Sequence, residues 1–157
     1  MNKEDKLLNK NAPDFEIEDQ HGEVHKLSEY KGKKVLLYFY PKDMTPGCTI
    51  EAKGFRDAWK DLEEAGVAVL GISADNVESH KKFCNKYNLN FPLLSDEKKQ
   101  VVKKYGVWVE KSMFGKKYMG IRRDSFLIGE DGKILKHYIK VKPAEHPAEV
   151  LKDVKEL

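Results

Sequence analysis

The chain has 157 residues and a net charge of +3, and its length fits one domain, residues 1–157, with a substantial buried core. Basic and acidic residues are interleaved along the chain, which argues against the continuous basic surface that binds nucleic acid. No apolar run approaches the length of a membrane span, and the first six residues lack the apolar core of a signal peptide. We therefore expect a cytoplasmic protein with no membrane segment and no nucleic-acid partner.

The first quarter of the chain is expected to start with a charged, frayed segment, residues 1–12. Residues 15–24 place apolar positions on both sides of a polar, glycine-containing turn, which predicts a short β-hairpin. A single helical turn is expected at 27–30. The apolar run 35–40 has the length and composition of a buried strand.

A loop and a long helix are expected to follow this strand. Two prolines and a glycine interrupt residues 41–47, and apolar residues then recur at three- and four-residue spacing, which predicts a helix over about 49–65. Gly66 is expected to end it, because glycine adopts the left-handed conformation cheaply. Cys48 lies where the loop gives way to the helix, and unpaired amides and the positive end of the helix dipole favour a thiolate there.

Strand and helix patterns alternate through the rest of the chain. The expected elements are a strand at 67–73, a helix that carries Val77, His80, Phe83, Cys84 and Tyr87 on one side and is capped by Asp75 or Asn76, and an extended piece at 91–96. A short helix through Val101 and Val102 capped by Ser95 or Asp96, strands at 125–128 and 134–139, and a helix that begins at His146 are expected to follow. An Asp-Gly turn joins the last two strands. This order predicts an α/β fold in which helices cover a mixed sheet, and the N-terminal β-hairpin is added to it.

Four residues that precede Cys48 in the chain suit a reactive sulfur. Pro41 has no N–H and can shield one side of the sulfur from water. The hydroxyl of Thr45 can donate to and accept from a small oxygen-containing substrate. Pro46 and Gly47 form a tight turn that brings backbone amides close. The alternative is that Cys48 is a small buried apolar residue, as cysteines commonly are.

The complete pattern Pro-x-x-x-Thr-x-x-Cys is typical of peroxiredoxins. Residues 38–49, Tyr-Phe-Tyr-Pro-Lys-Asp-Met-Thr-Pro-Gly-Cys-Thr, resemble the bacterioferritin comigratory (PrxQ) branch of that family. The resemblance covers nearly the whole chain and implies a thioredoxin-like fold. It also implies a thiol-dependent peroxidase without metal, haem or flavin, acting on hydrogen peroxide and alkyl hydroperoxides. Thioredoxin or a similar dithiol is the implied reductant, and a monomer or weak dimer is the expected assembly.

Cys84 is the second sulfur, 36 positions after Cys48. Taken alone it is more often a core residue. Lys81, Lys82 and Lys86 are near it in sequence and are expected to favour its thiolate.

The resemblance adds a role for this residue. The PrxQ branch usually carries its resolving cysteine five positions after the first, where this chain has Lys53. A smaller group carries it on the helix after the next strand, which Cys84 resembles. That placement implies that Cys84 resolves oxidised Cys48 as a disulfide, with local unwinding of a helix.

Arg123 precedes the expected strand 125–128. The peroxiredoxin resemblance, through Arg-x-Ser-Phe-Leu-Ile, selects Arg123 rather than Arg122 as the arginine that reaches the reactive sulfur. Its permanent charge and forked donors suit a thiolate and a peroxide oxygen together.

Other chemistries have weaker support in the sequence. His21 and His25 are four residues apart, but no cysteine or carboxylate cluster was expected beside them, so zinc binding is disfavoured. The absence of a Cys-x-x-Cys motif disfavours a protein disulfide exchanger. A one-cysteine peroxidase that uses an external thiol, and a peroxide-sensing protein on the same scaffold, remain open alternatives.

Overall fold

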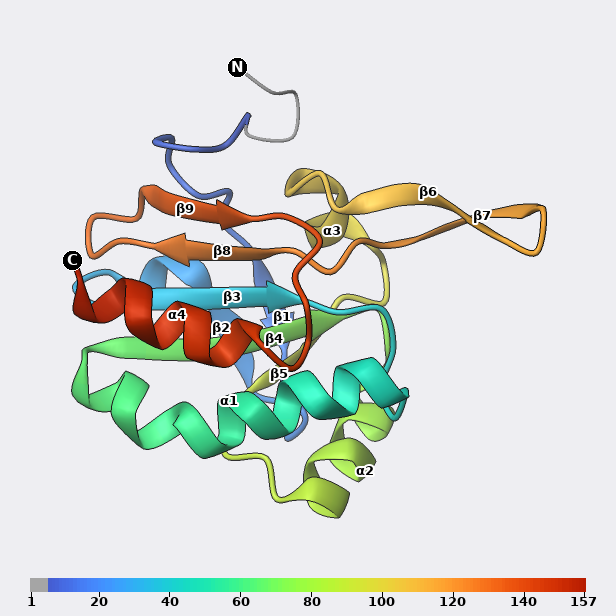
Figure 1. Ribbon diagram of the computed structural model, residues 1–157, viewed down its shortest axis with the longest axis horizontal. Helices are drawn as coiled ribbons and strands as arrows, with labels where there is room; N and C mark the ends of the chain where they lie inside the picture. The colour runs from blue at the N-terminus through green and yellow to red at the C-terminus, as the bar shows by residue number, and fades with distance from the viewer. Residues whose placement is uncertain (1–5) are drawn as a thin grey trace.

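A five-stranded mixed sheet runs through the centre of the computed structural model, which describes residues 6–157 (Figure 1). The strand order is β5-β4-β3-β8-β9. These strands are β3 (Lys34–Phe39), β4 (Val67–Ser73), β5 (Leu93–Ser95), β8 (Ser125–Ile128) and β9 (Ile134–Tyr138). β3, β4 and β5 are parallel, and β8 is antiparallel to both β3 and β9. The predicted mixed sheet, with an antiparallel pair extending parallel strands, is therefore confirmed.

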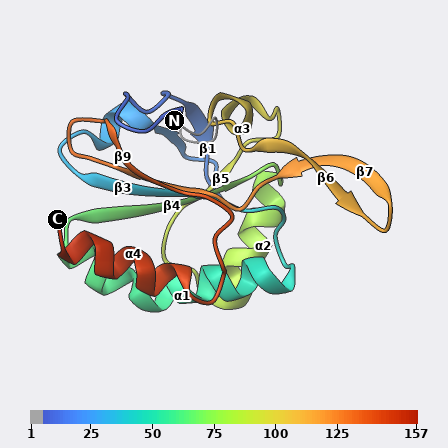
Figure 2. The same ribbon diagram turned by 45° about the horizontal axis from the view of Figure 1, so that its top comes forward.

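Helices cover the sheet on both faces (Figure 2). One face carries α1 (Pro46–Glu64), α2 (Val77–Tyr87) and α4 (His146–Lys155), and the other carries α3 (Gln100–Lys104) and the 3₁₀ helix η2 (Leu27–Tyr30). The side chains of β3 alternate between the two resulting cores, because successive residues of a strand point to opposite faces. Burial on both faces explains why this strand reads as a continuous apolar run.

The predicted N-terminal hairpin is present as β1 (Glu16–Glu18) and β2 (Val24–Lys26). Its turn is closed by Asp19, whose carboxylate accepts hydrogen bonds from the amides of His21 and Glu23 at 2.8 and 3.1 Å.

The long helix α1 packs closely against α4. A Cβ atom added at Gly54 would lie 2.7 Å from the ring of Pro147, so only glycine lets the two helices approach this far. The helix ends as predicted, since Gly66 follows it with a φ of +80°. It begins at Pro46, three residues earlier than the sequence indicated, and Cys48 therefore lies inside its first turn.

Two expectations for the chain's irregular parts were wrong. Residues 9–12 are not frayed, because Asn9 donates to Ile134 and Ala12 to Gly132, both at 2.9 Å; residues 1–5 of that segment lie outside the described residues. The segment for which no element was expected forms a second hairpin, β6 (Trp108–Met113) and β7 (Lys116–Ile121), which projects from the body as an arm (Figures 1 and 2). Within residues 6–157, no helix is long and apolar enough to cross a bilayer.

Candidate active site around Cys48

The thiol of Cys48 is held in the first turn of α1 and is only 1% exposed. Thr45 is the N-cap residue, and its carbonyl accepts the first helical hydrogen bond from the amide of Thr49 at 2.9 Å. The amides of Gly47 and Cys48 precede that bond, so they are among the helix amides that have no partner within the helix. The sulfur therefore lies at the positive end of the helix dipole.

Arg123 reaches this sulfur from the segment between β7 and β8. Its Nη1 donates to Cys48 Sγ at 3.4 Å and to Glu51 Oε1 at 2.9 Å. Gly47 makes room for it, because a Cβ atom there would stand 3.0 Å from Arg123 Nη2. Burial opposes the charge of the guanidinium, but the negative charges of Cys48 and Glu51 together raise the pKa of Arg123.

Arg122 points elsewhere. Its Nε and Nη2 donate to the buried carboxylate of Asp124 at 2.8 and 2.7 Å, and His137 Nε2 lies 2.7 Å from the same carboxylate. Burial alone would raise the pKa of Asp124, but the bonds from His137 and Arg122 outweigh it and lower that pKa. The two adjacent arginines therefore serve different partners, and only Arg123 contacts the thiol.

Glu51 is a site residue that the sequence interpretation missed. It is 0% exposed, its Oε1 binds Arg123, and its Oε2 has no hydrogen-bond partner among the described residues. Burial raises the pKa of Glu51 to about 7, although Arg123 pulls it down. One signal was available, because Glu51 is an acidic residue on the apolar stripe of α1, one turn after Cys48.

We expect Glu51→Gln to flatten the pH dependence of stability between about pH 4.5 and 7. In that window the unfolded chain has released this proton while folded Glu51 still holds it, so the wild type loses stability as the pH rises. Across this window the free energy of unfolding of the wild type should fall by about 3 kcal/mol more than that of Glu51→Gln. Urea unfolding at pH 5 and pH 8 measures it, and parallel pH profiles for the two proteins would contradict the prediction.

Thr45 and Pro41 lie in the loop that leads into α1, and both are half-buried. The hydroxyl of Thr45 donates to the carbonyl of Lys42 at 2.8 Å. Its proton is therefore engaged within the loop, while its oxygen lone pairs stay able to accept a hydrogen bond.

Cys84 lies on α2, in the same core cluster as Cys48 on one face of the sheet, and both are free thiols. The expectation that nearby lysines would favour its thiolate was wrong. Lys81, Lys82 and Lys86 are exposed, whereas burial, assisted by the negative charge of Asp43, raises the pKa of Cys84 to about 12.

Two groups of potential metal-ligating side chains occur among residues 6–157, namely Asp19 with Glu23 and His25, and Asp43 with Asp75 and His80. The first corrects the expectation that no carboxylates accompany His25. In each group the histidine already lies 2.7 Å from a carboxylate oxygen, His25 from Asp19 and His80 from Asp43.

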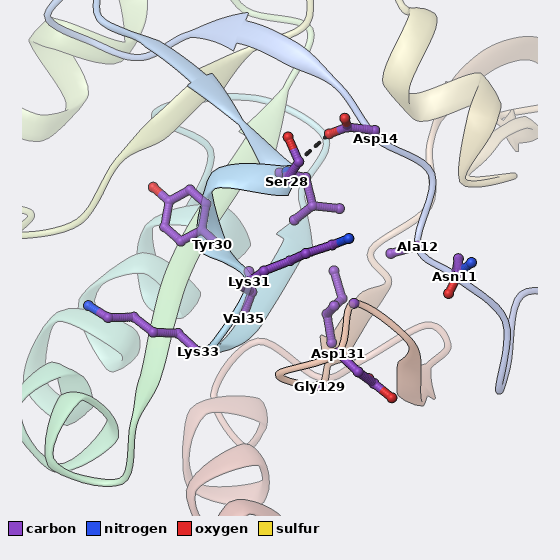
Figure 3. Close-up of a pocket in the computed structure, with 13 residues that line it drawn as sticks. Asn11, Ala12, Asp14, Ser28, Tyr30, Lys31, Lys33, Val35, Gly129 and Asp131 are labelled. Atoms are coloured by element: carbon purple, nitrogen blue, oxygen red, sulfur yellow. Dashed lines mark hydrogen bonds between the residues drawn. The ribbon is translucent and has the colours of Figure 1, made fainter.

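Of two hollows in the surface, one adjoins the site and the other is separate from it. One of about 320 Å³ adjoins Arg123 and is lined by Val109, Glu110, Lys111, Arg122, Arg123, Lys140 and Val141. Another, of about 200 Å³, lies near the start of β3, the end of that strand farther from Cys48, and Lys31 extends across it (Figure 3). None of the predicted site residues lines the second cavity, so it is separate from the sulfur.

A buried thiol in the first turn of a helix, on a thioredoxin-like sheet and in contact with an arginine, defines a class of thiol-based redox protein. Comparison with known proteins narrows the class. A model of the AhpC/TSA family matches residues 8–137. The chain belongs to this family, within the bacterioferritin comigratory (PrxQ) branch of the peroxiredoxins.

The relatives support this placement over nearly their whole length. The putative peroxiredoxin bcp of Coxiella burnetii is 56% identical over 140 residues, which span 89% of this chain and 93% of that one. Peroxiredoxin Bcp of Escherichia coli K12 is 52% identical over 145 residues, spanning 92% and 93% of the two chains. A structure of Xanthomonas campestris Peroxiredoxin Q, at 37% identity, covers 90% of each chain with a TM-score of 0.86. These homologues indicate thiol peroxidase activity, with peroxide substrates and a thiol reductant.

Proposed function

We propose that the protein is a thioredoxin-dependent peroxidase in which Cys48 is the peroxide-reducing nucleophile and Cys84 is the resolving cysteine. The observation that carries the proposal is the contact of Arg123 with the Cys48 sulfur at the start of α1. A related Xanthomonas campestris protein is described as having alkyl peroxide reduction activity, which supports alkyl hydroperoxides as substrates here. Hydrogen peroxide, which has the same O–O bond, is the second substrate that we propose.

In the first step the Cys48 thiolate attacks one oxygen of the peroxide. The O–O bond breaks, Cys48 becomes a sulfenic acid, and the other oxygen leaves, after taking up a proton, as water or an alcohol. Arg123 and the amides of the first turn stabilise the charge that develops on the leaving oxygen. Thr45 accepts a hydrogen bond from the peroxide O–H, since its own proton is given to Lys42. Pro41 limits the access of water.

The hollow beside Arg123 gives the organic group of an alkyl hydroperoxide a place to lie. Its lining includes the apolar side chains of Val109 and Val141 close to the guanidinium, so a substrate can be held at its peroxide end by charge and at its carbon end by apolar contact.

In the second step the Cys84 sulfur displaces the sulfenic oxygen, which leaves as water, and a Cys48–Cys84 disulfide forms. A dithiol protein then reduces it by exchange and is itself oxidised. The buried thiol of Cys84 is a poor nucleophile where it lies, because burial raises its pKa to about 12. Unwinding of α2 removes that burial, so the motion that brings the sulfurs together also activates Cys84.

Peptide mapping after one equivalent of hydrogen peroxide tests the proposal. We expect the wild type to lose both thiols and two hydrogens in mass, and to link the peptides that contain Cys48 and Cys84. Cys84→Ser should still undergo the first oxidation, and excess peroxide should drive its Cys48 to the sulfinic acid. Thioredoxin-dependent turnover of this variant should fall, and a small external thiol should restore part of it.

Two other outcomes would favour the alternative functions. An intact Cys84 thiol beside an oxidised Cys48 in the wild type would identify a one-cysteine peroxidase. The burial of Cys84 is the observation that favours that reading. Oxidation of Cys48 without turnover, in the presence of thioredoxin or any small thiol, would instead identify a peroxide sensor.

A further inference from the structure

The helix that carries Cys84 is fastened at its N-terminal end by a buried polar contact between Asp43 and His80. The carboxylate of Asp43, in the loop before α1, accepts a hydrogen bond from the hydroxyl of Tyr40 at 2.6 Å and from that of Ser79 at 2.8 Å. His80 Nδ1 lies 2.7 Å from the same carboxylate. The side chains of Asp43 and His80 are 2% and 0% exposed, so water does not weaken the contact.

Two further contacts hold the Asp43–His80 pair in place, one from β5 and one from Asp75 in the turn between β4 and α2. His80 Nε2 lies 2.9 Å from the carbonyl oxygen of Leu94 in β5, and the amide of Asp43 donates to the carboxylate of Asp75 at 2.8 Å. The charged and titratable groups that face His80 are therefore Asp43 and Tyr40, with Asp75 behind them. The first turn of α2 is therefore held to the loop before α1 and to β5.

The C-terminal end of α2 is capped by the amide of Leu89, which donates to the carbonyl of Cys84 at 3.1 Å, but among the described residues fewer polar side chains of other elements hold it. Its carbonyl at Tyr87 accepts one hydrogen bond, from Arg56 Nη1 at 2.8 Å, and the side chain of Arg56 is 27% exposed. The remaining contacts of Tyr87 with charged groups are the ammonium groups of Lys53 and Lys86 over its ring, at 5.8 and 5.5 Å. Because local opening begins where a structure is least stabilised, α2 should unwind from this end.

We infer that the Asp43–His80 contact is the fixed point at which this unwinding stops, and that His80 is a positioning residue for disulfide formation. The inference rests on the proposed resolving role of Cys84. Cys84 follows His80 by four residues, a span of at most about 14 Å when extended. The other side of the contact, Asp43, precedes Cys48 by five residues.

The contact shortens the path between the two sulfurs. Along the chain they are 36 residues apart, but through the Asp43–His80 contact the path is nine residues. β4 stays paired in the sheet, so without the contact the nearest fixed point before Cys84 is Ser73, 11 residues away instead of four. The entropic cost of closing a flexible segment is (3/2)RT times the logarithm of its length, so losing the contact should slow closure by about 4- to 5-fold. The contact therefore confines Cys84 near Cys48 after α2 unwinds.

Rapid quenching of the reduced full-length protein with a thiol-alkylating reagent, followed by mass spectrometry, separates the two steps after addition of hydrogen peroxide. We expect His80→Ala to oxidise Cys48 at the wild-type rate, to form the disulfide about 4- to 5-fold more slowly, and to accumulate more sulfinic acid. His80→Asn, whose amide nitrogen can take the place of Nδ1, should recover much of the rate. Ser79→Ala, which removes one donor to Asp43, should give a smaller loss in the same direction.

Arg56→Ala is the matched variant at the other end of α2, and it should accelerate disulfide formation. Tyr105→Phe loses a hydrogen bond to Pro13 at 2.6 Å, far from α2, and controls for general destabilisation. The inference is overturned if His80→Ala and Ser79→Ala form the disulfide as fast as the wild type or faster. A faster reaction would mean that the contact hinders the unwinding of α2, and an equal rate would mean that it only stabilises the fold.

Hydrogen exchange of the reduced protein tests, before any disulfide forms, whether the Asp43–His80 contact is the fixed point of α2. The amide of His80 should exchange more slowly than those of residues 84–87 in the wild type, and His80→Ala should remove that difference. Equal exchange at both ends of wild-type α2 would overturn the inference. Absence of a disulfide in the wild type would overturn the resolving role of Cys84 instead, so the two failures are distinguishable.

Discussion

Replacing Cys48 by serine is expected to abolish peroxide reduction while leaving the fold nearly intact. Serine has almost the same size and fits the buried position, but its hydroxyl has no accessible oxyanion near neutral pH. Steady-state consumption of hydrogen peroxide with a dithiol reductant measures the loss, and circular dichroism checks the fold. Appreciable turnover by Cys48→Ser would remove this residue from its central role.

Cys84→Ser is the matched control for this variant, because it also replaces a buried sulfur by oxygen on the same face of the sheet. It should retain a single oxidation at Cys48, measured as loss of one thiol per molecule. If both variants lost the first oxidation to the same extent, the defect would lie in packing around α1 and α2 and not in the chemistry of Cys48.

Arg123→Ala is expected to slow the oxidation of Cys48 by about 10²–10³-fold, the usual effect of removing one preorganised donor. The guanidinium is 18% exposed, donates to the sulfur at 3.4 Å, and faces the charge that develops in the transition state. The substitution also leaves Glu51 without its hydrogen-bond donor. Pseudo-first-order oxidation of Cys48 under excess peroxide, followed by stopped flow, measures the effect.

Arg122→Ala separates this effect from a general loss of positive charge. Arg122 is next in sequence, and its charge is balanced by Asp124. Its removal should lower the free energy of unfolding and leave the rate of Cys48 oxidation nearly unchanged. Equal losses of rate in the two variants would show that Arg123 does not act through its contact with the sulfur.

The sequence alone determined the sheet, the main helices and the position of Cys48. These features depend on local signals, namely the apolar run of β3, the three- and four-residue periodicity of α1 and α2, and turn residues such as Gly66 and Gly132. The bounds of β4 agree with the prediction, and α2 contains the residues expected in it. Asn76 caps α2 by accepting a hydrogen bond from the amide of Ser79 at 2.8 Å.

The β6–β7 arm escaped prediction because its local signals are weak. Its strands are rich in lysine, and its turn places Phe114 in the left-handed region, with a φ of 52° and 98% of the residue exposed. Phenylalanine rarely adopts that conformation, so turn chemistry did not indicate a hairpin. Its twelve paired residues satisfy each other's backbone groups, and that long-range pairing decided the structure.

The electrostatics of the site were decided only by the tertiary structure. Glu51 and Arg123 are 72 positions apart, and nothing in the sequence shows that they share a hydrogen bond. The lysines next to Cys84 in sequence point to solvent, while Asp43, 41 positions away, lies close enough to raise its pKa. Periodicity and turn preference are properties of neighbouring residues, whereas burial and charge pairing depend on residues that only folding brings together.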